Sequence, residues 1–152
     1  MNEIKIKRML LAGLAMFVVW VAVELLVEHG IARILLGQSS QQMWQQVIEL
    51  NEWSPLNYWV NTFISLLNCT VLIWLYASLR PMYGVGTRTV LITSAFGIIL
   101  GFSLFINFIN LGLLPLKLGL IEAVFEAIEF PIAMIAGAGV YEGQEKWSPE
   151  TE

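Results

Sequence analysis

Four long apolar stretches dominate this sequence and restrict what it can fold into. They run approximately over residues 9–36, 56–79, 89–110 and 114–141. About 20 helical residues cross the roughly 30 Å of hydrocarbon in a bilayer, so each stretch is long enough. Inside lipid, an open sheet would leave backbone groups without hydrogen bonds, whereas a helix satisfies its own. We therefore predict an all-α integral membrane protein, with residues 1–152 forming one four-transmembrane-helix bundle.

The composition agrees with lipid as the solvent. Hydrophobic residues make up 57% of the 152 residues and charged residues only 13%, against roughly 25% charged residues in ordinary soluble domains. A soluble domain of this size leaves about a third of its unfolded surface exposed, so it could not hide this much apolar surface. The net charge of −4 comes without a basic patch, so the expected partner is the bilayer and not nucleic acid.

The connection between the first two stretches has a pattern of its own. Met43, Trp44, Val47 and Ile48 recur at helical spacing among glutamine and glutamate residues. This pattern predicts a short amphipathic helix over residues 40–51 that lies in the membrane interface, with tryptophan at headgroup depth.

The basic residues predict the orientation. One side of the membrane would collect Lys5, Lys7, Arg8, Arg80, Arg88 and Lys146, and the other only Arg33 and Lys117. Because lysine and arginine are enriched in cytoplasmic loops, both termini are expected in the cytoplasm. Residues 80–88 would form the turn between the second and third spans, and residues 142–152 a short solvated tail that begins at Glu142.

Each span carries one polar stripe. The spacing is i, i+4 in the first span and i, i+4, i+7 in the others, which keeps each stripe within about 60° of the helix circumference. The stripes consist of Glu24 and Glu28; Asn61, Ser65 and Asn68; Ser103, Asn107 and Asn110; and Glu122, Glu126 and Glu129. Turning all four stripes inward keeps charged groups out of lipid, where each costs at least about 2.5 kcal/mol.

Depth adds a second expectation. Most of these polar residues lie in the outer half of the bilayer. The same helix faces become apolar towards the cytoplasm, through Phe17, Trp20, Leu72, Leu75, Phe96, Ile99, Ala133 and Ala136. We predict a polar pocket that opens outward and is closed by a packed inner half, with Glu24, Glu28, Glu122, Glu126, Glu129 and the four asparagines as ligand-binding residues.

Several carboxylates in one pocket need neutralisation, because like charges at short range in low dielectric cannot all ionise. They can take up protons, bind a cation or coordinate a divalent metal ion. A metal site would use His29, Glu28, Glu24 and Glu126. The pattern lacks the paired Glu-x-x-His signature of di-metal bundles, and structural pairing of the carboxylates with Arg33 and Lys117 is the competing interpretation.

Three functional classes follow. The first is a protein whose outward pocket binds or transports a cation, a proton or a small polar ligand. The second is a non-catalytic accessory subunit of a larger membrane complex, and the third a metal-dependent membrane enzyme. Since the sequence shows no nucleophile–base pair, phosphate loop or dinucleotide motif, we do not expect a hydrolase or kinase and assign no catalytic residue.

The third span contains the close-packing pair Gly97 and Gly101, spaced as in helix–helix contacts. It predicts docking of another helix or of a second copy of the chain, and so a homo-oligomer or a larger complex. The pair lies on the helix face away from Asn107.

The chain also resembles uncharacterised bacterial four-span membrane proteins of about 150 residues. The resemblance rests on His29 and Gly30, on residues 72–81, and on Gly84 and Gly86. The resemblance implies the four-span fold and transfers no activity. The expected location is a bacterial cytoplasmic (inner) membrane.

Overall fold

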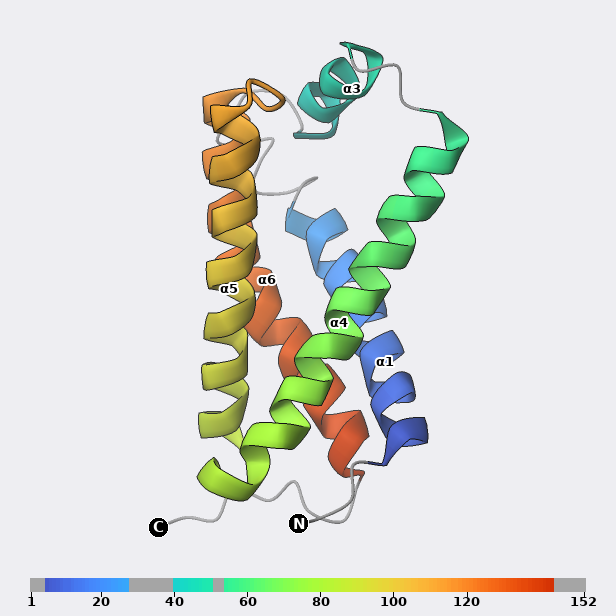
Figure 1. Ribbon diagram of the computed structural model, residues 1–152, viewed down its shortest axis with the longest axis vertical. Coiled ribbons are helices and arrows are strands. Elements are labelled where there is room, and N and C mark those ends of the chain that lie inside the picture. Colours follow the sequence, from blue (N-terminus) through green and yellow to red (C-terminus); the bar gives the residue numbers. More distant parts are fainter. Residues whose placement is uncertain (1–4, 28–39, 51–53, 144–152) are drawn as a thin grey trace.

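The computed structural model describes residues 5–27, 40–50 and 54–143, and the regular structure within these ranges is helical. The helices are α1 (Ile6–Val27), α3 (Ser40–Leu50), α4 (Pro55–Tyr83), α5 (Thr87–Asn110) and α6 (Leu116–Glu142). Figure 1 shows α1, α4, α5 and α6 running between two ends of a bundle, with α3 across one end. Three of them, α1, α4 and α5, are long and apolar enough to cross a membrane.

The most centrally placed helix is α6, which packs against α1, α4 and α5. Small side chains let α1 approach it closely: a Cβ atom at Gly137 would lie 2.9 Å from the Met16 Cβ and 3.2 Å from the Ala12 carbonyl oxygen. The buried face of α6 continues through Ala133 and Ala138. The three helices that qualify as spans are therefore arranged around α6, which carries four glutamate residues.

A buried apolar cluster fills the end of the bundle that contains the start of α1 and the end of α6. We call this the inner end and the opposite one, next to α3, the outer end (Figure 1). The cluster includes Leu72 and Ala133, with Phe17 and Trp20 packed against it. The expected apolar inner half is present for Phe17, Leu72 and Ala133.

The sequence predicted the wrong buried face for α5, which is rotated about its own axis relative to that prediction. Phe96 and Ile99, expected in the core, are exposed, and the buried face carries Val90, Thr93 and Gly97. The reason is close packing: a Cβ atom at Gly97 would lie 3.2 Å from Leu72 and 3.4 Å from Phe130. The helix docking expected for the pair Gly97 and Gly101 is thus made by α4 and α6 of the same chain.

Two hydroxyl groups of α5 do not need an inward stripe, because they bond to their own helix. Thr93 Oγ1 donates to the Thr89 carbonyl at 2.9 Å, and Ser103 Oγ donates to the Ile99 carbonyl at 2.7 Å. Such i−4 bonds satisfy a hydroxyl group wherever it points. The polar stripe was therefore a poor guide to which face of α5 is buried.

The turn between α4 and α5 is shorter than predicted. Helix α4 continues through Arg80 and Pro81 to Tyr83, although Pro81 has no N–H to offer the preceding turn. The connection is reduced to residues 84–86, where Gly84 and Gly86 have φ values of +85° and +131°. Glycine adopts these values without the steric cost that a Cβ atom brings.

The outer half of α4 has few neighbours in the chain. In Figure 1 this half leans away from α5 and α6. Between residues 54 and 68 every side chain is exposed except Ser65 and Leu66, which are half-buried. The described residues therefore do not enclose the α4 polar stripe as predicted.

A helix, α3, is present where the amphipathic helix was predicted. Its Val47 is buried against Leu114 and Leu118 at the start of α6, and Met43 and Trp44 pack around them. The apolar face of α3 thus covers the outer end of the α5–α6 pair.

The tail does not begin where it was predicted. Glu142, expected in solvent, is the last residue of α6 and is buried. Its partners, described below, explain why a charged residue remains in the fold at this position.

Candidate functional site

The site is built on three glutamate residues of α6. Glu122 and Glu129 are buried and Glu126 is half-buried, so the predicted i, i+4, i+7 stripe does face inward. Glu24 of α1, also half-buried, lies close enough for its charge to act on Glu126 and Glu129. We call these four side chains the carboxylate cluster. It lies in the outer half of the bundle, because it uses the end of α1 and the beginning of α6.

Two tryptophan residues donate hydrogen bonds to the cluster. The indole Nε1 of Trp20 donates to Glu129 Oε2 at 3.1 Å, and that of Trp44 donates to Glu122 Oε1 at 2.9 Å. Trp20 lies parallel to Phe130, with 6.4 Å between the ring centroids, so packing holds its donor in place. The carboxylate cluster therefore combines hydrogen-bond donors from α1 and α3 with acceptor oxygens from α6.

The sequence interpretation missed both tryptophan donors. It placed Trp20 in the apolar inner half and Trp44 at headgroup depth in an interfacial helix. The available signal was chemical, since a buried indole N–H usually finds a hydrogen-bond acceptor. Neither contact could be located from spacing, because the donors lie 109 and 78 residues from their acceptors.

Glu126 differs from its neighbours. Its Oε2 atom is buried and has no hydrogen-bond partner among the described residues. The carboxylate lies against the backbone of Gly101, where an added Cβ atom would overlap Oε2 and lie 3.1 Å from Cδ. Across the bundle its charge acts on Cys69 of α4. Glu126 therefore lies among α4, α5 and α6, in a place that only a glycine on α5 leaves open.

No basic side chain is paired with Glu126 or Glu129 in the described part of the chain. Lys117, considered as a neutralising partner, is exposed near the start of α6. Within the described ranges, several carboxylates thus meet without a fixed positive charge beside Glu126 or Glu129.

The remaining predicted ligand residues are placed differently. The four asparagines Asn61, Asn68, Asn107 and Asn110 are exposed and not enclosed with the glutamates. Glu28 and His29 lie outside the described residues, as does Arg33. Among the residues that are described, no group of three or more histidine, cysteine, aspartate or glutamate side chains is arranged to hold a metal ion.

Comparison of the chain with protein-family models, with curated proteins and with solved structures gives no match. The functional argument therefore rests on the residues themselves.

Proposed function

We propose that this chain is a small polytopic membrane protein whose carboxylate cluster binds a cation or a proton from the outer side of the membrane. In this proposal α6 crosses the bilayer together with α1, α4 and α5, as the fourth span of an inner-membrane protein. Its 27 residues are enough to span, and the helices packed around it would shield its glutamates from lipid.

The observation that carries the proposal is the environment of Glu126. A carboxylate oxygen that is buried without a donor loses the water that stabilised it, which is costly unless something else neutralises the charge. Glu24 and Glu122 add negative charge nearby. A cation or a proton offsets both the desolvation of the Glu126 carboxylate and its repulsion from Glu24 and Glu122, because it neutralises the carboxylate and bonds to its free oxygen.

The distribution of positive charge supports an outward-facing site. Lys5, Lys7, Arg8 and Arg88 all lie exposed at the inner end of the bundle, which the charge rule assigns to the cytoplasm. The carboxylate cluster lies towards the other end. A cation that approaches from outside would meet the negative charge without passing the basic end.

Cation-dependent stability tests the proposal. A ligand that binds only the folded state stabilises it by about 2.7 kcal/mol at a hundred times its Kd. We expect the unfolding temperature of the detergent-solubilised protein to rise with at least one of the chlorides of Na⁺, K⁺, Ca²⁺ and Mn²⁺, at constant ionic strength. Glu126→Gln should abolish the rise while the protein still folds.

The matched control is Glu49→Gln, which removes the same charge from an exposed position on α3. This variant should respond to the cation as the parent protein does. An equal response of the Glu126→Gln and Glu49→Gln variants would show that the stabilisation is not caused by the cluster.

The outer half of α4 favours a second candidate, an accessory subunit or oligomer. Asn61 and Asn68 are exposed on a helix that is apolar enough to span the membrane. An amide exposed to lipid gains from a partner helix with which it can exchange hydrogen bonds. Such a partner would use α4, because Gly97 and Gly101 are already covered by α4 and α6 of the same chain.

Chemical cross-linking in native membranes tests this candidate. Asn61→Leu/Asn68→Leu should remove a cross-linked species that the parent protein forms, and Leu56→Ala, on the same exposed half of the helix, should keep it. If the parent protein is monomeric in native membranes, this candidate is wrong.

A further inference from the structure

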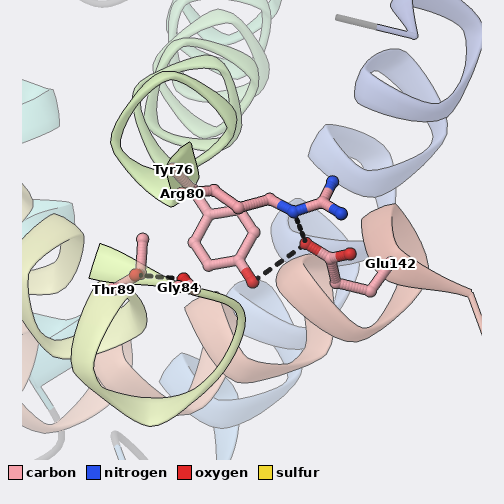
Figure 2. A network of polar contacts seen from close by, with 5 residues as sticks. All are labelled: Tyr76, Arg80, Gly84, Thr89 and Glu142. Carbon is pink, nitrogen blue, oxygen red and sulfur yellow. Dashed lines mark hydrogen bonds and ion pairs between the residues drawn. The ribbon is translucent and has the colours of Figure 1, made fainter. Parts of the chain in front are cut away.

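The inner end of the bundle contains a buried polar network that the proposed site does not use. Figure 2 shows Arg80 and Tyr76, one turn apart on α4, both reaching the carboxylate of Glu142 on α6. The Arg80 Nε and Glu142 Oε1 atoms are 3.2 Å apart, and the Tyr76 hydroxyl donates to the same oxygen at 3.2 Å. The Glu142 side chain is only 1% exposed and that of Arg80 23%.

This network ties together the inner ends of α4 and α6. Tyr141, next to Glu142, packs edge-on against the ring of Tyr76, with centroids 6.2 Å apart. The turn after α4 is fixed separately, by the Thr89 hydroxyl that donates to the Gly84 carbonyl at 2.6 Å (Figure 2). The polar contacts between α4 and α6 can therefore separate while the turn keeps its own hydrogen bond.

A buried ion pair is poor evidence of a stabilising device. The free-energy cost of desolvating the two charges can exceed the energy of their attraction. Apolar side chains of similar volume often stabilise a fold as well or better. A polar network of this kind suits a helix–helix contact that closes in one geometry and is able to open. The position of the network fits such a role, because it lies at the end of the apolar core on the side away from the carboxylate cluster.

The stretch between the network and the cluster is packed with buried apolar side chains, so the helices would have to separate for it to open. Cys69 is about 10 Å along α4 from Tyr76, given the helical rise, and the charge of Glu126 reaches it. Opposite this stretch, α6 presents the small residues Ala133, Gly137 and Ala138. Separation of the helices at the inner end would thus open a route from the cytoplasm to the level of Cys69 and Glu126.

We propose that Tyr76, Arg80 and Glu142 form an inner latch, which closes the carboxylate cluster to the cytoplasm and whose release exposes it to that side. The inference rests on the proposed function, since it gives the outward-facing site a second, gated side. Release of the latch replaces the Arg80–Glu142 ion pair and the Tyr76 hydrogen bond with hydration of the three groups.

The native cysteine provides the test. Cys69 is the single cysteine of the chain and is buried, so it should react slowly with a charged, membrane-impermeant maleimide. We expect Glu142→Gln and Arg80→Gln to raise the labelling rate at least ten-fold when the reagent reaches the cytoplasmic face of inside-out vesicles. Labelling from the outer face should stay slow, and Tyr76→Phe should give a smaller rise.

Arg88→Gln is the matched control. Arg88 is a basic residue of the same end, but its guanidinium lies over the Tyr83 ring, 5.3 Å from the centroid, and outside the network. This variant should label as slowly as the parent protein. Unchanged labelling of Glu142→Gln and Arg80→Gln would overturn the latch. So would an equal rise from both faces with a lower unfolding temperature, because the network would then be a structural tether.

The two proposals can fail separately. Glu126→Gln should leave Cys69 labelling slow, and Glu142→Gln should keep the cation-dependent rise in unfolding temperature. Cation binding without faster labelling overturns the latch alone. Faster labelling from the inner face without cation binding by the parent protein overturns the proposed function and leaves a gated bundle.

Discussion

Glu126 and Gly101 form the contact on which the site depends most. The sequence predicted that Glu122, Glu126 and Glu129 share an inward face, because helical spacing fixes that relation within one helix. It did not predict Gly101 as the residue that leaves space for the Glu126 carboxylate. Contacts between helices depend on how each helix is rotated, which spacing along one helix does not determine.

Gly101→Ala should therefore destabilise the protein. Its Cβ atom would overlap Glu126 Oε2, and overpacking of this kind typically costs about 1–3 kcal/mol. Gly139→Ala is the control, because a Cβ atom at Gly139 meets nothing within 4 Å. Alanine is favoured over glycine in a helix by up to about 1 kcal/mol, so this control should be neutral or stabilising. Reversible unfolding in detergent measures both, and equal effects would contradict the placement of Glu126.

Trp20 provides a second prediction about a single side chain. Trp20→Phe keeps an aromatic ring beside Phe130 but removes the donor to Glu129. Glu129 is only 3% exposed, and loss of a partner for a buried acceptor costs about 1–3 kcal/mol. Trp59→Phe, at a position that is 74% exposed, should change the free energy of unfolding by less than about 0.5 kcal/mol. Equal losses in the two variants would show that the Trp20 hydrogen bond contributes nothing.

At the scale of elements, hydrophobic length predicted the helices well and their rotation less well. The expected stretches correspond to α1, α4, α5 and α6, and α3 ends within one residue of its predicted end. The polar stripe of α6 faces inward, whereas that of α5 does not. On α6 the carboxylates need shielding, but on α5 the Ser103 hydroxyl of the stripe bonds to its own backbone and the glycine face gives closer packing. Which helix face is buried thus depends on what each polar group can bond to, and not only on where the polar groups lie.

The rotation of α5 can be tested with two substitutions on neighbouring residues. Gly97→Leu places a large side chain against Leu72 and Phe130, and we expect a loss of at least about 1–3 kcal/mol. Phe96→Leu changes a half-exposed ring on the other side of the helix, and a surface change of this kind usually stays within about 0.5 kcal/mol. A larger loss of unfolding free energy in Phe96→Leu than in Gly97→Leu, measured by the same experiment, would indicate that α5 has the rotation that its polar stripe predicted.

At the scale of the whole molecule, the bundle has two unlike ends. The outer end contains the carboxylate cluster beneath α3, and the inner end contains the apolar core and the network at Glu142. The sequence predicted this polarity from the depth of its glutamates. It placed Glu142 in a solvated tail, because a glutamate after the last apolar run has no visible partner. That partner, Arg80, is 62 residues away in the chain, in a segment that was expected to be a turn.

The topology predicts which positions each side of the membrane can reach. In a Cys69→Ala background, Gln45→Cys and Leu113→Cys should react with an impermeant thiol reagent from the outside, and Thr87→Cys only from the inside. All three positions are exposed. A reporter fused after Glu152 should lie on the cytoplasmic side. An outside reporter, with Leu113→Cys reacting from the outside, would mean that α6 does not cross the membrane. Reaction of Leu113→Cys from the inside would contradict the predicted orientation.

The central claim is that the carboxylate cluster binds a cation or a proton at Glu126. Its most direct test is to count the cations bound and the protons released per chain, by equilibrium dialysis and acid–base titration of the purified protein. We predict saturable binding of one of the four cations with release of protons, or reversible proton uptake without a cation. Glu126→Gln should lose this binding and Glu49→Gln should keep it. A folded parent protein that binds no cation, and that takes up protons as the Glu126→Gln variant does, would contradict the account.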